Sequence, residues 1–494
     1  MILIVSGCRV DDELYRLKKT VWSPEIAIPV AHAKVSASDL LSKNKSELIT
    51  LDEQDRITLS YDALLYSKSG AELLVLADKV LALIPGVREY ELPFNESSII
   101  EYLKFGKGQL QLLLEGPSRA EIAKVEIRIS SLHLNGVPFE ITQTNVTQLD
   151  ELFDLTGAEL FFGSGNRISA EFFVFNEQGA DITHNYSLFL RFKNMVIKQA
   201  KGWFDNLILD FETDTISLDV FDNWKKGTIY LDDPRINISF SNSIGIPFTA
   251  SVSTFDASKD GQGATIVPID YKSALGDSFT IQYPSGDDIE GYVNSIFRLD
   301  RNNSNIRNVI QISPSELHYG FNLVTRHSQL NQLPGTITDT SQLKVTTQLE
   351  LPFTCRIDNV FAIDTISVST NLSSELLKVE RALMEVTTEN ALPLGALIQV
   401  YLLDSKYNII DSVLTDRNFL TAANIDGYGF VISPNETKTS IGTTDQQLQA
   451  LRKTQFMLVM AQLETSDAGQ KTVSFQGSNY LSVDLALRLK YKIQ

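Results

Sequence analysis

Apolar and polar residues alternate with a period of two along much of this chain. In these stretches every second residue is aliphatic or aromatic, and the residues between them are mostly polar. One apolar and one polar face is typical of an antiparallel sheet with one side in water. The pattern therefore predicts β-strands through most of the chain. It is clearest at 57–61, 110–114, 125–129, 216–220, 236–240, 343–349 and 483–487.

Turn signals separate these stretches at short intervals. Glycine follows a polar residue at Asn135-Gly136, Asp260-Gly261, Asp426-Gly427 and Gln476-Gly477. Such pairs close tight hairpins, because Gly and Asn tolerate the left-handed backbone that the turn needs. Short strands with frequent turns predict an all-β protein made of tandem antiparallel β-sandwich domains of the immunoglobulin-like kind.

Helical periodicity is confined to a few short stretches. We expect helices over Gly70–Ile84, Glu290–Leu299 and Asp445–Arg452, the last with Thr444 as its N-cap. Helices this short favour a structural role, in which they cap the ends of the sandwiches.

The length of 494 residues sets the expected number of domains. At about 150 residues per domain, a chain of this size divides into roughly three. We place a signal and tether at 1–20, a β-rich domain at 21–155, a middle sandwich at 156–330 and a C-terminal sandwich at 331–494.

Charge and cysteine content narrow the classes of partner. The formal net charge is −18, which disfavours a nucleic-acid partner because phosphates are repelled. The two cysteines, Cys8 and Cys355, form no CxxC pair, and the five histidines are scattered. We therefore expect neither a metal site nor a cofactor. A Cys8–Cys355 disulfide is one alternative, and a lipid on Cys8 would exclude it.

The N-terminus carries the most specific motif. Val5-Ser6-Gly7-Cys8 follows an apolar start and resembles a bacterial lipobox, in which an aliphatic residue and two small residues precede the lipidated cysteine. Only seven residues precede Cys8 and none is basic, which is short for a complete signal. We expect the natural start to lie further upstream. The alternative is that the start of the chain is simply a first β-strand.

An acidic cluster follows the lipobox. Asp11, Asp12 and Glu13 stand shortly after Cys8, an arrangement that resembles the surface-export signal of Bacteroidota lipoproteins. The resemblance implies an outer-membrane protein held through the lipid on Cys8 and exposed on the cell surface. The alternatives are the periplasmic face of that membrane, or a plain solvated tether.

One motif recurs along the chain. An alternating strand leads to Asn, a short spacer, an aliphatic residue, Pro and a second strand, as at Asn242 and Asn390, with a fainter copy at Asn135. Asn can close a turn with its side chain, and Pro suits a strand start that needs no N–H. The motif resembles the Asn–Pro junction of late-embryogenesis-abundant type-14 domains and of uncharacterised Bacteroidota lipoproteins. The alternative is three ordinary hairpins with similar turns. The copies lie within 125–141, 235–255 and 383–404.

The sequence offers little catalytic chemistry. It contains no nucleophile elbow, Walker loop or HExxH. We therefore expect a non-enzymatic structural or accessory subunit of an outer-membrane complex, with the membrane and an outer-membrane protein as partners. The first alternative is a glycan-binding or adhesin module that uses Trp203 and Trp224, since exposed aromatic rings stack on sugars or partner proteins. The second is a hydrolase assembled from distant loops.

Overall fold

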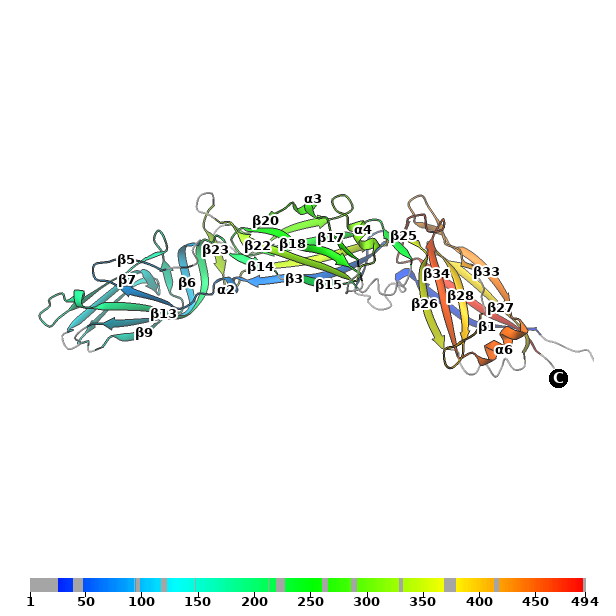
Figure 1. Cartoon of the computed structure of the whole chain (residues 1–494), viewed down its shortest axis with the longest axis horizontal. Coiled ribbons are helices and arrows are strands. Elements are labelled where there is room, and N and C mark those ends of the chain that lie inside the picture. Colours follow the sequence, from blue (N-terminus) through cyan, green and yellow to red (C-terminus); the bar gives the residue numbers. More distant parts are fainter. Residues whose placement is uncertain are drawn as a thin grey trace, which may run out of the picture.

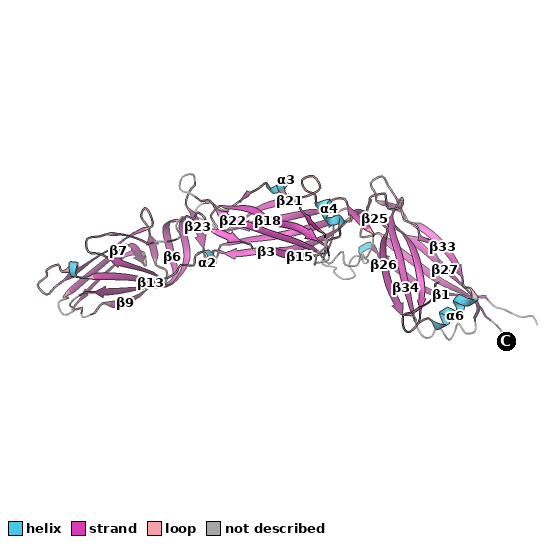
Figure 2. Ribbon diagram, in the orientation of Figure 1, coloured by secondary structure: helices cyan, strands magenta, loops and turns pink. Residues whose placement is uncertain are grey.

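The fold is described from a computed structural model, and strands dominate it (Figure 2). No helix in the described part of the chain is long and apolar enough to cross a bilayer. The all-β sandwich class expected from the alternation is confirmed. The structure describes residues 25–38, 48–92, 94, 98–116, 122–146, 148–211, 213–218, 227–259, 265–285, 291–327, 332–367, 379–412 and 417–491.

Three sheet-rich lobes follow one another along the longest axis (Figure 1). We call them the terminal sandwich (25–36 and 360–491), the middle sandwich (49–73 and 208–352) and the far sandwich (79–203). The terminal sandwich contains the first and the last described strands, which pair with each other. The chain therefore runs out through the middle sandwich to the far one and returns the same way.

The terminal sandwich has two main sheets, ordered β1-β36-β27-β33 and β26-β34-β28-β29, with β30 also on β28. Helix α6 lies at one end (Figure 1). Its elements are β1 (Glu25–Ser36), β26 (Val360–Ser367), β27 (Val379–Asn390), β28 (Leu394–Leu403), β29 (Ile409–Ser412), β30 (Arg417–Leu420), β31 (Asn424–Ile425), β32 (Val431–Ser433), β33 (Asn435–Gly442), α6 (Asp445–Lys453), β34 (Phe456–Thr465) and β36 (Tyr480–Tyr491).

The middle sandwich pairs the sheet β2-β3-β24-β17-β21 with the sheet β14-β22-β18-β19, to which β15 and β20 add. Its elements are β2 (Ile49–Leu51), β3 (Ile57–Ser69), α2 (Gly70–Leu73), β14 (Ile208–Asp210), β15 (Asp214–Ser217), β17 (Arg235–Asn242), β18 (Phe248–Ser258), β19 (Ile266–Pro268), α3 (Lys272–Leu275), β20 (Phe279–Ile281), β21 (Val293–Leu299), α4 (Ile306–Gln311), β22 (Glu316–Thr325) and β24 (Gln342–Pro352).

The far sandwich is built around two long strands, β6 and β13, whose register shifts near their centres. The N-terminal half of β13 and the C-terminal half of β6 pair in the order β4-β13-β6-β9. The other halves of these two strands belong to the order β23-β13-β6-β10-β7-β12. Its elements are β4 (Lys79–Leu83), β5 (Glu89–Glu91), β6 (Ile99–Glu115), β7 (Lys124–Leu134), β8 (Val137–Thr144), β9 (Asp150–Asp154), β10 (Glu159–Phe161), β11 (Arg167–Ser169), β12 (Glu171–Phe175), η3 (Thr183–Asn185) and β13 (Ser187–Trp203).

The three sandwiches share one strand order. In each sandwich a strand from the N-terminal end pairs with the last strand: β1 with β36, β3 with β24, and β4 with β13. In each sandwich the last strand then pairs with β27, β17 or β6 respectively. A domain whose N- and C-terminal strands lie side by side can be inserted into another domain without distortion. It can also accept such an insertion itself. This shared order explains how the far sandwich can sit inside the middle one, and the middle one inside the terminal one.

The strand pairing does not follow the expected division into three consecutive domains with boundaries at 155 and 330. Strand β3, from the expected first segment, pairs with β24 from the expected third. Strand β1 likewise pairs with β36. Periodicity reports that a segment is a strand but not which distant strand it meets. The insertion of one sandwich into another therefore cannot be recognised from the local pattern of apolar and polar residues.

The alternating residues form the core as expected. Leu110 and Leu112 are fully buried on β6, while Gln111 between them stays half-exposed. Residues Ile236, Ile238 and Phe240 on β17 are also buried. Each such side chain contributes about 2 kcal/mol when it leaves water, so these faces provide much of the stability of the sheets.

Two of the three expected helices are wrong. Within 70–84, only Gly70–Leu73 is helical, and Lys79–Leu83 forms strand β4 on the edge of β13. Within 290–299, Val293–Leu299 forms strand β21 against β17. Sheet pairing outweighs the weak helical preference of such short stretches. Helix α6 and its Thr444 N-cap are confirmed, and the structure shows that Gln447 completes a capping box.

The Asn–Pro motif marks crossings between sheets. Asn242 ends β17 in one sheet of the middle sandwich, and the chain enters the other sheet at β18 directly after Pro247. Asn390 does the same between β27 and β28 of the terminal sandwich. The fainter copy differs, because Asn135, at φ 52°, sits in the hairpin turn between β7 and β8 of one sheet. The first two copies are therefore equivalent, and the third is an ordinary hairpin.

Each crossing Asn is buried, and its side chain is hydrogen-bonded to nearby backbone groups. The Asn390 amide donates to the carbonyls of Leu394 and Thr421, each at 2.8 Å, and its oxygen accepts from the Leu392 N–H at 2.9 Å. Asn242 accepts from the Ile244 N–H at 2.8 Å in the same way. Backbone groups that leave one sheet and have not yet joined the next need such partners.

Candidate functional site

All residues of the expected anchor lie outside the described part of the chain. This applies to Cys8, to the lipobox residues Val5, Ser6 and Gly7, and to the acidic cluster. Strand β1 begins at Glu25, after the segment 9–24 that separates it from Cys8. The structure does, however, place the strand to which that segment leads.

Of the two expected binding tryptophans the structure describes only Trp203, and the binding role stays a prediction. Trp224 lies outside the described residues. Trp203 ends β13, is half-buried, and donates its indole N–H to the Gln332 carbonyl at 2.9 Å. Gln332 belongs to the loop that leads into β23, so this hydrogen bond ties the far sandwich to the middle one. Trp203 thus has a structural task at the junction.

Backbone pairing also holds the junction between the middle and far sandwiches, which we call the far junction. Strand β23 (Gly335–Thr338) extends the sheet of the far sandwich along residues 199–202 of β13. A Cβ on Gly335 would lie 2.3 Å from the Gly245 carbonyl oxygen, so only glycine fits there. Because the two backbones approach this closely, the middle and far sandwiches are packed directly against each other at this junction.

A buried histidine supports the same junction. His327 accepts from the Phe204 N–H through Nδ1 at 3.4 Å and donates through Nε2 to the Leu333 carbonyl at 2.8 Å. Its burial lowers the pKa of the imidazole below its usual value. An apolar hollow of about 260 Å³ lies beside it, lined in part by Leu74, Phe94 and Phe204. Its lining includes Leu76 and Leu207, from the two segments that lead from one sandwich to the other.

The junction of the middle and terminal sandwiches is tied by a backbone ladder. The Ile57 N–H donates to the Phe475 carbonyl at 3.1 Å, and the Phe475 N–H donates to the Phe353 carbonyl at 3.1 Å. The Phe353 N–H in turn donates to the Ile57 carbonyl at 2.8 Å. The rings of Phe353 and Phe475 meet edge-on at 4.9 Å between centroids, and both are buried. Three separate chain segments therefore close this junction.

A small sheet spans the same region. It runs in the order β16-β25-β35 and consists of β16 (Thr228–Leu231), β25 (Thr354–Asp358) and β35 (Val473–Ser474). Cys355 points into the core from β25 as a fully buried free thiol, and burial raises the pKa of this thiol. A buried thiol of raised pKa is unreactive.

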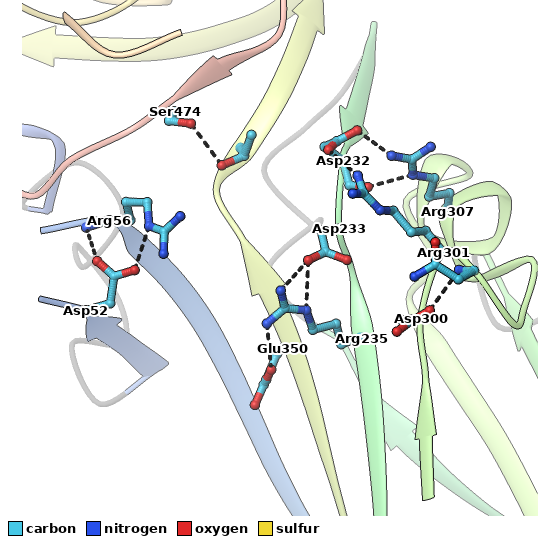
Figure 3. Close-up of polar contacts among 12 residues, drawn as sticks. Asp52, Arg56, Asp232, Asp233, Arg235, Asp300, Arg301, Arg307, Glu350 and Ser474 are labelled. Atoms are coloured by element: carbon cyan, nitrogen blue, oxygen red, sulfur yellow. Dashed lines mark hydrogen bonds and ion pairs between the residues drawn. The ribbon is translucent and has the colours of Figure 1, made fainter. Parts of the chain in front are cut away.

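Charged side chains line one side of this junction (Figure 3). Asp232 pairs with Arg301 at 2.8 Å and also with Arg307, while Arg235 pairs with Asp233 and, at 3.7 Å, with Glu350. Half-exposed pairs of this kind contribute at most about 1 kcal/mol each. Their effect is to fix the loops that flank β16 and α4.

The described residues contain no group of three or more His, Cys, Asp or Glu side chains that could hold a metal ion. A polar hollow of about 400 Å³ on the middle sandwich is lined by Asp62, Asn237 and Lys344, among others. It is shallow and lies over the strands of one sheet.

No protein-family model matches this chain, and no curated protein matches it in sequence. Among solved structures, it is similar to a candidate secreted protein from Parabacteroides distasonis ATCC 8503, with 12% identity and a TM-score of 0.32, over 60% of this chain and 89% of the other.

Two viral proteins show still more distant similarity. For a protein of infectious bursal virus derived T=1 particles, the identity is 8% and the TM-score 0.16, over 93% of this chain and 84% of the other. For the major capsid protein P2 of bacteriophage PM2, the identity is 10% and the TM-score 0.12, over 56% of this chain and 97% of the other.

Proposed function

We propose that this protein is a non-enzymatic, lipid-anchored component of the outer membrane or cell surface, and that it serves as a structural or accessory subunit of an outer-membrane complex. In this proposal the lipid on Cys8 holds the terminal sandwich at the bilayer. The far sandwich is then the part presented to a partner protein.

One observation supports this orientation above the others. Glu25, where β1 begins, lies opposite Lys490 near the end of β36 in the antiparallel pair. The segment that carries Cys8 therefore joins the body at the outer end of the terminal sandwich. An anchor attached there would leave the middle and far sandwiches directed away from the membrane.

The path of the chain through the three sandwiches suits a structural subunit, because it favours a rigid body. Each sandwich beyond the terminal one is attached by an outgoing and a returning segment, and both junctions carry backbone pairing. Two tied segments resist bending better than one flexible linker, because relative domain motion needs a free linker or a weak interface. The arrangement favours a spacer that keeps the far sandwich at a fixed position.

The anchor is tested directly on Cys8. Protein is isolated from membranes of its native host, and its N-terminal peptide is analysed by mass spectrometry after labelling with radioactive palmitate. We expect Cys8 to carry acyl chains and a Cys8→Ser variant to leave the membrane fraction. A free thiol at Cys8 would remove the basis of the proposal.

The side of the membrane is a separate question. The acidic cluster at Asp11, Asp12 and Glu13 favours export to the cell surface. External protease added to intact cells should then degrade the protein, and replacing the three acids by alanine should protect it. Protection of the unchanged protein would instead place it on the periplasmic face.

A further inference from the structure

The polar hollow on the middle sandwich, which we call the middle hollow, lies on the outer face of the sheet β2-β3-β24-β17-β21. Its volume of about 400 Å³ falls in the range of about 300–1,000 Å³ that is typical of small-molecule sites. Side chains from three neighbouring strands line it, among them Asp62, Leu64, Asn237, Ser239, Lys344 and Gln348. The middle hollow is therefore large enough for a small ligand and rich in groups that can bind one.

Strand register explains why the sheet is hollowed at this place. Ser239 on β17 lies opposite Thr346 on β24, and Thr346 lies opposite Leu64 on β3. Ser239 follows the buried Ile238 and precedes the buried Phe240, so its own side chain projects from the outer face. Because Ser239 and Thr346 are short, they form a low floor between longer neighbours. A register shift next to Thr346 marks a bulge in β3, and a bulge redirects the side chains beside it.

Exposed apolar and aromatic side chains lie at the two ends of this floor. Leu64 on β3 is 58% exposed, and Ile296 on β21, which lies opposite Ser239, is 66% exposed. Neighbouring strands are about 4.8 Å apart, so the three strand steps from β3 to β21 span about 14 Å. Tyr292, just before β21, is 53% exposed, and its hydroxyl lies 3.5 Å from the Gln342 Oε1 on β24. The floor is therefore flanked by surfaces on which an apolar face of a ligand can pack.

Two amide side chains border the floor and are held in position by each other. Gln348 on β24 lies opposite Asn237 on β17, and on its other side it lies opposite Asp62 on β3. The Asn237 amide donates to the Gln348 Oε1 at 3.3 Å and to the Glu350 Oε1 at 3.1 Å. These bonds use the donor end of Asn237 and the acceptor end of Gln348. The Asn237 Oδ1 then remains as an acceptor for a ligand, and the Gln348 amide remains as a donor.

The charges that line the middle hollow balance each other. Asp62 and Lys344 are both exposed, and neither makes an ion pair or a side-chain hydrogen bond within the described part of the chain. Beyond the lining, Arg298 is exposed on β21, whereas Arg235 and Glu350 pair with each other at 3.7 Å. A hollow that has one acid and one base in its lining has no excess charge to select an ion. Its chemistry instead suits an uncharged ligand with many polar groups.

We propose that the middle hollow binds an uncharged carbohydrate. Each sugar hydroxyl both donates and accepts hydrogen bonds, which the carboxylate of Asp62 and the amides of Asn237 and Gln348 can match. The C–H face of a sugar ring packs on exposed apolar and aromatic side chains, here Leu64 and Tyr292. The inference goes beyond the structural role proposed above, because it assigns a ligand to the middle sandwich, and it does not depend on the lipid anchor.

The test applies the full chain, with Cys8→Ser to keep it free of lipid, to an array of neutral and anionic oligosaccharides. The neutral oligosaccharide with the strongest signal is then titrated by calorimetry at low and at high salt. We expect binding to neutral oligosaccharides and no weakening as salt is raised, because salt screens only interactions between charges. An array without neutral binders would overturn the proposal. So would a preference for anionic oligosaccharides that disappears at high salt.

Substitutions in the lining locate the binding site. Asp62→Ala and Tyr292→Ala should each weaken binding of that oligosaccharide about tenfold, and the double variant should weaken it about a hundredfold. The matched control, Glu436→Ala/Tyr428→Ala, removes an exposed acid and an exposed tyrosine from the terminal sandwich and should bind like the parent chain. Equal loss in both double variants, or unchanged binding by Asp62→Ala/Tyr292→Ala, would overturn the proposal. Circular dichroism establishes that both double variants keep their strands.

A peptide is the other ligand that these side chains could bind, and a second array distinguishes it. The same protein is applied to an array of peptides of mixed sequence. Peptide binding that Asp62→Ala/Tyr292→Ala loses, without binding to any oligosaccharide, would show a peptide site and overturn the proposal. The outcome is also separable from the proposed function. Acylated Cys8 without oligosaccharide binding would contradict only this inference, and oligosaccharide binding with a free Cys8 thiol would contradict only the anchor.

Discussion

Replacing Asn390 by alanine should weaken the terminal sandwich selectively. The substitution removes three hydrogen bonds of 2.8 to 2.9 Å at a site with 1% exposure. It leaves the Leu392 N–H and the carbonyls of Leu394 and Thr421 without this partner. At a net value of about 1 kcal/mol per hydrogen bond, the expected loss is about 3 kcal/mol. For a domain of this size, that loss lowers the melting temperature by about 6–12 °C.

The measurement must report on one sandwich at a time, because unfolding of three linked domains is not a single two-state event. Hydrogen exchange followed by mass spectrometry provides this resolution. Peptides from β27 and β28 should exchange faster in Asn390→Ala, while peptides from β6 and β13 should not change. The exposed Asn294 on β21 supplies the control, since Asn294→Ala should stay within about 0.5 kcal/mol of the parent. Equal effects of the two substitutions would refute the role of the crossing Asn.

Three further predictions concern the middle sandwich and the far junction. Burial, with the nearby Asp214 carboxylate, raises the pKa of Tyr319 to about 12. Its contribution to stability should therefore be complete below about pH 10 and lost as the pH rises toward 12, so Tyr319→Phe should flatten the pH dependence of urea midpoints in that range. Gly335→Ala places a Cβ against a backbone carbonyl and should cost about 1–3 kcal/mol, seen as faster proteolysis of the junction. Trp203→Phe loses the hydrogen bond to Gln332 and should cost about 1 kcal/mol, with unchanged signals on a glycan array; lost glycan binding would instead favour the adhesin alternative.

The sequence predicted local structure correctly where a short pattern of residue types determines it. The alternation at Ile236, Ile238 and Phe240 predicted a strand with a buried face, and these side chains are at most 1% exposed. Thr444 was expected to cap a helix over Asp445–Arg452, and it caps α6. In both cases the sequence signal lies within a few residues, although the buried face of β17 packs on distant residues such as Phe321.

Long-range pairing was not readable in the same way. The stretch at Val80–Ile84 is apolar at almost every position, which fits a helix or a strand equally well. Its pairing with β13, more than a hundred residues later, decides the outcome. The hollow that Arg381 and Lys490 line together at one end of the terminal sandwich was missed for a related reason. Arg381 and Lys490 are far apart in the chain, and only the register of β27 against β36 brings them together.

The orientation of the molecule is the central claim, and a fluorescence quenching experiment tests it most directly. The lipidated protein is placed in vesicles whose headgroups carry a quencher, and a fluorophore is attached at Lys406→Cys or at Lys107→Cys. Labelling is specific because Cys355 is fully buried and the lipid blocks Cys8. The account predicts strong quenching at position 406 of the terminal sandwich and none at position 107 of the far sandwich. Equal quenching at both positions, or quenching at 107 alone, would contradict it.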